Sequence, residues 1–270
     1  MSLPPPGADR TAVVTGASSG IGAAIARELA DRGHQVTLVA RSVDKLDQLA
    51  AELRESGARA NVLAADLSDR PTRAGLLGRI TELGLVPDIL INNAGLSTLG
   101  PVHAADPATE LNMIEVDVVA VADLCTRFLP GMVERGRGAL LNVASTAAFQ
   151  PLPGQAAYGA GKAFVLSYTQ SLAGELRGTG VTATALCPGP VDTGFGETAG
   201  FEKDDAEAAL PSFMWVSPEV VAKTAVDGLA RGRLVAIPGV ANRVGAVFAQ
   251  IAPRTLLIPI LAKNHPGLKH

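Results

Sequence analysis

Short apolar runs alternate with segments of helical periodicity along most of the chain. The runs are rich in Val, Ile, Leu and Ala, which favours buried strands, and apolar residues spaced three and four apart follow them, which favours helices. After the first run, Ile21, Ile25 and Leu29 keep helical spacing until Arg32-Gly33 ends the pattern. Seven runs are predicted to be strands: Thr11–Val14, Gln35–Ala40, Asn61–Ala65, Pro87–Ile91, Ala139–Val143, Val181–Leu186 and Leu234–Ile237.

This alternation predicts an α/β fold, a doubly wound Rossmann-like parallel sheet of seven strands flanked by helices. A chain of 270 residues with 47% hydrophobic content can bury one substantial core, so residues 1–270 are interpreted as a single domain. Residues 194–215 are rich in Gly, Ala and acidic side chains, a composition that suits a mobile substrate lid. Residues 240–270 form an apolar C-terminal tail.

The first predicted strand leads directly into the glycine-rich run Thr15-Gly16-Ala17-Ser18-Ser19-Gly20-Ile21-Gly22. A glycine-rich turn between a strand and a helix presents backbone N–H groups and the positive end of the helix dipole to an anion. The alternative is a plain turn, but the strand before it and the helix after it favour a dinucleotide phosphate site. The residues expected to bind the cofactor here are Gly16, Ser18, Ser19, Gly20, Ile21 and Gly22.

The end of the second strand indicates which dinucleotide binds. An NAD site carries an acidic residue there for the ribose hydroxyl, but this chain has Ala40 followed by Arg41. A guanidinium can bind a 2′-phosphate bidentately, so NADP(H) is preferred over NAD(H). The alternative is that Arg41 is only a surface cation beside a helix.

Two further strand ends carry candidate cofactor contacts. Asp66-Leu67 follows the third strand, where the carboxylate could accept the adenine amino group or, alternatively, cap the next helix. Asn92-Asn93-Ala94-Gly95 follows the fourth strand, and its small residues and amides suit a backbone that runs beside a nucleotide.

Ser145, Tyr158 and Lys162 are the candidate catalytic residues. On a helix, Tyr158 and Lys162 at i and i+4 share one face. An ammonium about 4 Å from a phenolate, at an effective dielectric of about 20, favours ionisation by roughly 4 kcal/mol. The pair is therefore expected to bring the pKa of Tyr158 toward neutrality, while Ser145 holds the substrate oxygen. A lone Tyr-x-x-x-Lys is more often an ordinary surface pair, and the glycine-rich turn upstream favours catalysis.

Together these motifs resemble the short-chain dehydrogenase/reductase family over roughly residues 10–240. The resemblance implies that Lys162 also binds the nicotinamide ribose, that Asn93 lines the cofactor and that Tyr158 exchanges the proton during hydride transfer. It also implies homodimers or homotetramers. Residues of the run Pro188-Gly189-Pro190-Val191-Asp192-Thr193 would flank the nicotinamide: Pro188, Gly189, Val191 and Thr193.

One position departs from the family pattern. The family places an asparagine in the long helix after Asn-Asn-Ala-Gly, where its backbone carbonyl holds a proton-relay water, and this chain has Asp117 there. Asn112 is a poor substitute because five residues turn it roughly 140° around the helix. Asp117 is kept as the fourth catalytic candidate, although its carboxylate would compete with Tyr158 for the ammonium of Lys162.

Composition excludes several functions. A net charge of −3 without a basic block argues against nucleic acid, and the four His and two Cys show no metal-ligand spacing, so no metal is expected. Cys125 and Cys187 are expected to be buried reduced thiols. Met1–Arg10 holds three prolines and no apolar core of a signal peptide, which leaves cytoplasmic location as the default.

The tail has two interpretations. Apolar residues dominate 240–261, but arginines and prolines interrupt them, so the segment is too broken to span a bilayer. It either covers the substrate mouth or an oligomer interface, or it makes peripheral membrane contact, with Arg243, Arg254 and Lys263 on its polar face.

The sequence thus predicts an NADP-dependent oxidoreductase that interconverts a carbonyl and a secondary alcohol, mainly as a reductase. An apolar pocket formed by lid and tail favours a lipophilic ketone or 3-oxoacyl substrate. The alternatives are a non-catalytic NADP-binding redox sensor or scaffold and an NAD-dependent alcohol dehydrogenase. The residues expected in the apolar pocket are Phe195, Phe201, Phe213, Met214 and Trp215.

Overall fold

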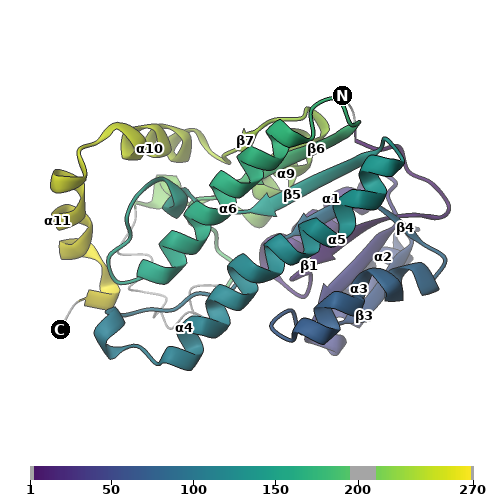
Figure 1. The fold of residues 1–270 in the computed structure, drawn as a ribbon, viewed down its shortest axis with the longest axis horizontal. Helices are drawn as coiled ribbons and strands as arrows, with labels where there is room; N and C mark the ends of the chain where they lie inside the picture. Colours follow the sequence, from purple (N-terminus) through teal and green to yellow (C-terminus); the bar gives the residue numbers. More distant parts are fainter. Residues whose placement is uncertain (1–2, 195–210, 269–270) are drawn as a thin grey trace.

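A parallel sheet of seven strands forms the centre of the molecule in the computed structural model, which describes residues 3–194 and 211–268 (Figure 1). The order across the sheet is β3-β2-β1-β4-β5-β6-β7, and every neighbouring pair is parallel. The predicted doubly wound sheet is confirmed, and each predicted strand matches within about one residue. The strands are β1 (Arg10–Thr15), β2 (Val36–Ala40), β3 (Ala60–Ala64), β4 (Val86–Asn92), β5 (Gly138–Val143), β6 (Val181–Leu186) and β7 (Val235–Ala236).

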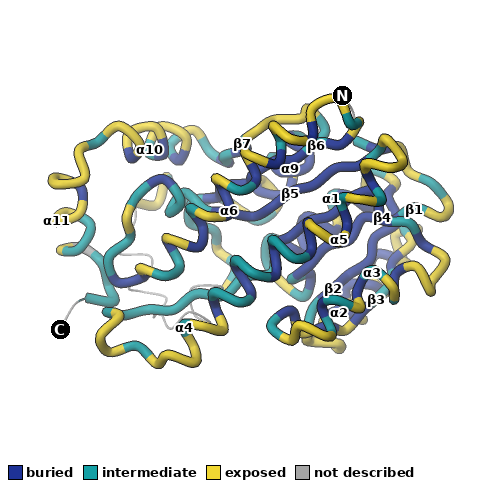
Figure 2. The backbone as a smooth tube through the Cα atoms, in the orientation of Figure 1, coloured by how far each residue is buried: buried dark blue, intermediate teal, exposed yellow. Residues whose placement is uncertain are grey.

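Helices cover both faces of this sheet and leave its strands buried (Figures 1 and 2). Alternate residues of β1 feed two separate cores: Ala12 and Val14 pack on one face and Val13 on the other. On the first face lie α1 (Gly20–Asp31), α2 (Val43–Glu55) and α9 (Pro218–Ala230), and on the second lie α3 (Arg70–Glu82), α5 (Ala120–Glu134) and α6 (Ala156–Glu175).

The strand order reverses direction beside β1. The chain builds β1, β2 and β3 outward to one edge and then returns to place β4 on the other side of β1. The loops after β1 and β4 therefore leave the sheet in opposite directions, which opens a crevice at the carboxyl ends of the strands.

The long helical segment after β4 is interrupted by a π-turn. It consists of α4 (Pro107–Ile114), the π-turn η2 (Glu115–Val119) and α5. Single π-turns inside α-helices are often found at functional sites. This one contains Asp117, the residue that departs from the family pattern.

The tail folds into two helices at one end of the molecule (Figure 1). It contains α10 (Val240–Ile251), α11 (Arg254–Asn264) and the short turn η5 (Pro266–Leu268). Among the residues described, no helix combines the length and the apolar character needed to cross a bilayer. Most of the predicted lid, including Phe195 and Phe201, lies outside the described residues.

Both cysteines, Cys125 and Cys187, are buried and unpaired, as expected.

Candidate active site

A cavity of about 810 Å³ opens at the carboxyl ends of the strands and gathers most of the predicted site residues. Gly22 and Asp117 are not part of its lining and act from behind it. The predicted residues that line it are Gly16, Ser18, Ser19, Gly20, Ile21, Arg41, Asp66, Leu67, Asn93, Ala94, Gly95, Ser145, Tyr158, Lys162, Pro188, Gly189, Val191 and Thr193.

The glycine-rich turn needs glycine at each of its three positions. Gly16 and Gly20 have φ of +65° and +54°, a region that other residues rarely adopt. A Cβ at Gly22 would run into the carbonyl oxygen of Gly16 and lie 2.5 Å from the amide nitrogen of Asn93. The turn therefore packs directly on the segment that follows β4.

Asn93 and Thr15 fasten the turn to β4. The Asn93 side-chain amide donates to the carbonyls of Thr15 (3.0 Å) and Gly16 (3.2 Å). The Thr15 hydroxyl accepts from the backbone N–H groups of Asn93 (3.0 Å) and Ala94 (3.1 Å). In this structure Asn93 lines the cavity and also holds the loop in shape.

The N-terminus of α1 faces the cavity without a side-chain cap. Its N-cap, Ser19, makes no capping hydrogen bond, and the first turn holds no acidic residue. By contrast, Asp69 caps α3 and Ser217 caps α9. Uncapped N–H groups and the helix dipole suit a phosphate group.

A second uncapped helix start lies at the end of β2. Ser42, the N-cap of α2, makes no side-chain capping bond, and Arg41 and Ser42 both line the cavity. This donor set fits a further anionic group next to the first.

Asp66 shapes the turn after β3. Its carboxylate accepts from the backbone N–H (2.9 Å) and the hydroxyl (2.8 Å) of Ser68. The alternative that Asp66 caps the next helix is wrong, because Asp69 caps α3 by accepting from the N–H of Thr72. Asp66 and Leu67 remain at the cavity wall.

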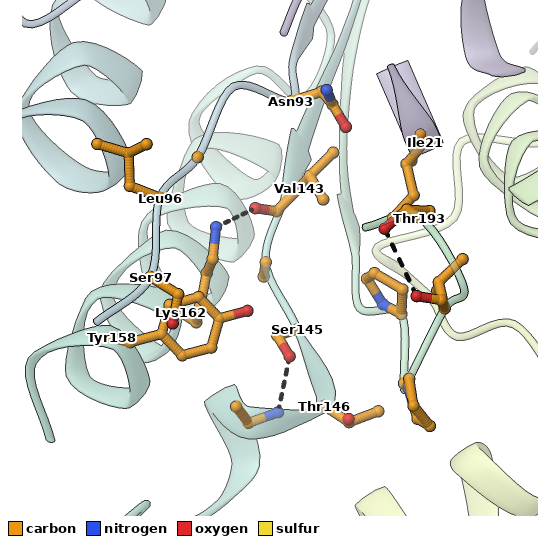
Figure 3. Close-up of a pocket in the computed structure, with 18 of the residues that line it drawn as sticks. Ile21, Asn93, Leu96, Ser97, Val143, Ser145, Thr146, Tyr158, Lys162 and Thr193 are labelled. Atoms are coloured by element: carbon orange, nitrogen blue, oxygen red, sulfur yellow. Dashed lines mark hydrogen bonds between the residues drawn. The ribbon is translucent and has the colours of Figure 1, made fainter. Parts of the chain in front are cut away.

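Ser145, Tyr158 and Lys162 lie together on one side of the opening, with Ile21 and Thr193 across from them (Figure 3). Ser145 lies two residues after β5, at the N-cap of the short turn Thr146–Phe149, and its hydroxyl accepts from the N–H of Ala147 (3.1 Å), which fixes the oxygen and leaves the hydroxyl proton to donate. The ammonium of Lys162 lies 5.5 Å from the centre of the Tyr158 ring and donates to the carbonyl of Val143 (3.2 Å).

Asp117 supplies a buried counter-ion for Lys162. The Asp117 carboxylate is 1% exposed, its Oδ2 lies 2.9 Å from Nζ of Lys162, and its Oδ1 accepts from the N–H of Leu96 (2.7 Å). The expected competition for the ammonium is therefore present in the structure. Asn112 lines the cavity instead.

The ionisation of Tyr158 differs from the sequence-based expectation. Burial raises the pKa of Tyr158 above its ordinary value; the ammonium of Lys162 and a hydrogen bond with Ser145 oppose this, and the carboxylate of Asp117 reinforces it. The expectation of a pKa near neutrality gave most weight to the ammonium of Lys162, and it is wrong for this structure because burial and the carboxylate of Asp117 together outweigh that ammonium.

Lys162 remains charged despite its burial. Burial lowers the pKa of Lys162, but Asp117 and Tyr158 outweigh it, so that the pKa lies above its ordinary value. Burial also raises the pKa of Asp117, which the ammonium partly offsets. Each buried charge depends on the other.

The segment after β6 closes over the glycine-rich turn. A Cβ at Gly20 would lie 2.9 Å from the Cβ of Thr193. Val191 pairs with Val216 in an isolated bridge, and the buried amide of Asn242 donates to the carbonyls of Met214 (3.0 Å) and Pro238 (3.1 Å). Asn242 was not among the predicted residues, although a polar amide near the start of a largely apolar helix marks it in the sequence.

Three hydrogen-bonded polar side chains, which the sequence motifs did not predict, line another part of the cavity. The Gln155 amide donates to the hydroxyl of Ser97 (2.7 Å), and the Gln155 oxygen lies 3.2 Å from Nε2 of His265. Burial lowers the pKa of His265. These residues come from three segments far apart in sequence, so no local pattern pointed to them.

The apolar wall of the cavity comes from the tail as well as from the lid. Met214 and Trp215 line it as expected, whereas Phe213 is 71% exposed and does not, because η4 (Ser212–Met214) turns it toward solvent. Additional lining residues, not predicted, are Phe248, Ala249, Ile260 and Leu261.

Comparison with known proteins gives one consistent family. The sequence matches the short chain dehydrogenase family over residues 10–203. It is 41% identical over 192 residues to a short chain dehydrogenase of Pseudocercospora fijiensis, a match that covers 69% of this chain and 61% of that protein. It is also 34% identical to the very-long-chain 3-oxoacyl-CoA reductase of Anas platyrhynchos, covering 98% of this chain and 82% of the relative.

A solved structure agrees with the sequence matches. A short-chain dehydrogenase from Sphingobium yanoikuyae, in complex with NADPH, superposes with a TM-score of 0.79 at 35% identity, covering 93% of this chain and 95% of that one. The family match spans more than half of this chain. The chain therefore belongs to the short-chain dehydrogenase/reductase family of oxidoreductases.

Proposed function

We propose that this protein is an NADP(H)-dependent reductase that converts a lipophilic ketone or 3-oxoacyl compound into a secondary alcohol. The observation that carries the proposal is the arrangement of Ser145, Tyr158 and Lys162 on one cavity, opposite an uncapped helix start. The three side chains can exchange a proton with a substrate oxygen, and the helix start can hold an anionic cofactor.

The residues present fit a dinucleotide with two anionic parts. The N–H groups at the start of α1 would hold the pyrophosphate, and Arg41 and Ser42 would hold the 2′-phosphate that distinguishes NADP from NAD. The Sphingobium yanoikuyae relative in complex with NADPH supports this choice. When bound, the nicotinamide exchanges a hydride with the carbon that bears the reacting oxygen.

Tyr158 acts as the proton donor. Because its pKa is raised, the phenol is protonated at neutral pH, which is the form required to protonate the oxygen of a carbonyl during reduction. Ser145 donates its hydroxyl proton to the same oxygen and fixes its direction. The raised pKa of Tyr158 thus keeps the phenol in the form that reduction requires at neutral pH.

Lys162 stabilises the phenolate that Tyr158 leaves behind. Its ammonium is held by Asp117 and the carbonyl of Val143 and lies over the ring of Tyr158. The charge is therefore in place before the proton leaves, which avoids reorganisation during the reaction.

The substrate end of the cavity favours an apolar molecule with a polar end. Met214, Trp215, Phe248 and Ile260 form apolar walls, and Gln155 with its hydrogen-bonded neighbours forms a polar edge. The relationship to a very-long-chain 3-oxoacyl-CoA reductase over 98% of this chain supports the same substrate class.

The test is NADPH oxidation with a panel of aldehydes, diketones, steroid ketones and 3-oxoacyl thioesters. Tyr158→Phe should lower turnover by about a hundredfold or more, because it removes the proton donor, and should leave NADPH binding intact. Tyr168→Phe is the matched control: Tyr168 lies on the same helix but stacks on Phe164 (5.4 Å between ring centres) and does not line the cavity. Tight NADPH binding without turnover across the panel would instead favour a non-catalytic sensor.

Cofactor choice is tested separately. Arg41→Ala should raise the Kd of NADPH by about tenfold or more and leave that of NADH unchanged, since one charge-assisted contact is lost. Lys45→Ala removes a charge from the same helix start outside the cavity lining and should change neither value. An NADPH affinity that does not respond to Arg41→Ala contradicts the NADP assignment.

A further inference from the structure

The helix α10 has its small residues inside and its large apolar residues outside. Its buried positions are Asn242, Ala246 and Ala249. The exposed side carries a stripe with helical spacing, including Val240 (71% exposed) and Ile251 (75% exposed). A surface helix normally buries its large apolar residues, so this stripe is inverted. The stripe consists of Val240, Val244, Val247, Phe248 and Ile251.

The following helix extends the exposed apolar surface. Among the side chains of Arg254–Lys263 in α11, only Leu257 is buried, and Leu256, Ile258 and Ile260 are exposed. Eight of the seventeen large hydrophobic residues that are exposed in the described part of the chain lie between Val240 and Ile260. In Figure 2 the exposed colour follows both helices along one end of the molecule. Single exposed apolar residues are ordinary, but a cluster of this kind marks an interaction surface.

The same end of the chain is positively charged. All 26 acidic residues lie at or before Asp227, whereas α10 and α11 carry three basic residues and no acidic one, so a chain of net charge −3 has a charge of +3 on these two helices. Arg243 and Arg254 donate to backbone carbonyls, which leaves their charge uncompensated. Among the described side chains, neither they nor Lys263 form an ion pair.

We propose that α10 and α11 dock peripherally on a lipid surface that carries anionic headgroups. The exposed apolar side chains would enter the boundary between headgroups and acyl chains, and the basic residues would contact the anionic headgroups. A second copy of this chain is a poorer occupant, because a symmetric contact would bring two helix pairs of charge +3 together without an acidic side chain on either of them.

Docking here places the lipid surface next to the cavity. Phe248 is 61% exposed and also lines the cavity, and Ile260 does both as well. The two helices therefore form a layer that contributes side chains both to the cavity and to the exposed surface. Delivery of a lipophilic substrate through this layer rests on the proposed function, whereas the docking itself does not.

The experiment is co-sedimentation of the full chain with vesicles of phosphatidylcholine alone and with phosphatidylserine added. The wild type should bind the anionic vesicles, less at high salt, and should bind the neutral vesicles weakly. The double variant Val244→Asp/Ile251→Asp should reduce binding by about tenfold or more, because two apolar side chains no longer transfer from water. Both residues are exposed and outside the cavity lining, so circular dichroism and thermal unfolding should be unchanged.

Two controls separate apolar contact from charge and from general surface effects. Leu83→Asp replaces a residue that is 47% exposed after the end of α3, away from the tail, and should leave vesicle binding unchanged. Lys263→Gln/Arg243→Gln should weaken binding to anionic vesicles and reduce its salt dependence.

Sedimentation velocity of the same proteins distinguishes a lipid surface from a second copy of this chain as the partner of α10 and α11. Loss of vesicle binding in the double variant with an unchanged oligomeric mass supports the lipid surface. A wild type that does not bind vesicles, or binds both compositions equally, overturns the proposal. An oligomer that dissociates in the double variant while vesicle binding is unaffected identifies a second copy and also overturns it. Failure of the proposed reductase activity leaves these readouts unaffected.

Discussion

The carboxylate of Asp117 lies 2.9 Å from the ammonium of Lys162, and both groups are buried. Lys162 in turn lies over the ring of Tyr158, so that a negative, a positive and a titratable group form one row. The resembling family has an asparagine where this chain has Asp117. The negative charge of Asp117 therefore acts on Tyr158, the proposed proton donor, in two ways. It raises the pKa of the phenol directly, and it pairs with Lys162, whose ammonium lowers that pKa.

Replacing Asp117 with asparagine is expected to shift the pH dependence of catalysis. The Asp117 carboxylate raises the pKa of Tyr158, and its removal should lower that pKa. Alcohol oxidation, which needs the phenolate, should then reach its half-maximal rate at a lower pH in Asp117→Asn than in the wild type. The pH profile of kcat for oxidation measures this.

Glu110→Gln is the control for Asp117→Asn. It removes one negative charge from α4, the helix just before the π-turn, without touching Lys162. Its pH profile should match the wild type. If the profile of Asp117→Asn also matches the wild type, the charge of Asp117 does not act on Tyr158.

The two directions of the reaction should respond to pH with opposite sign. In the proposed reaction the protonated phenol of Tyr158 is the form active in reduction, and its pKa lies above the ordinary value of 10.0. Reduction should therefore remain high through neutral pH and fall only as the pH rises past that value, whereas oxidation should increase over the same range. Rates of NADPH oxidation and NADP reduction against pH provide the measurement, and a reductase rate that falls between pH 6 and about 8 would contradict it.

The fold could be predicted because its signals are local. The run Thr11–Val14 is apolar on both faces since the strand is buried on both, and Gly16, Gly20 and Gly22 show the turn that follows it. The i, i+4 spacing of Tyr158 and Lys162 is also a local signal. Both residues lie on α6, so the helical spacing alone places their side chains on one face.

What could not be predicted depends on residues far apart in the chain. The pKa of Tyr158 is raised by burial and by Asp117, 41 positions earlier, and the Tyr158–Lys162 spacing contains neither of these effects. Ser97, Gln155 and His265 meet only after the tail has folded back. In α10, the apolar residues were visible in the sequence, but which of them face solvent follows from the buried position of Asn242.

A buried arginine should contribute strongly to stability. Arg73 is 2% exposed, pairs with Asp123 (2.7 Å) and Glu115 (3.0 Å), and donates to the carbonyl of Leu67. Arg73→Ala removes the buried partner that Glu115 and Asp123 share, although each keeps a more exposed arginine, and is expected to lower the free energy of unfolding by about 3 kcal/mol. Urea unfolding measures it. Arg70→Ala, which breaks an exposed pair with the same Glu115, should change it little, and equal effects would contradict the role of burial.

The glycine at position 22 should be essential for cofactor binding because of packing. In Gly22→Ala the new methyl group would meet the carbonyl oxygen of Gly16 and the amide of Asn93, so the glycine-rich turn must move. The variant should lose NADPH affinity by about tenfold or more and unfold at a lower temperature. Fluorescence titration and thermal unfolding measure the two effects. Gly75→Ala is the matched control: it adds the same methyl group to α3, where no atom lies within 4 Å, and should raise stability by about 1 kcal/mol without changing NADPH affinity. If Gly22→Ala binds NADPH as well as Gly75→Ala does, close packing of α1 on the turn is not what shapes the phosphate site.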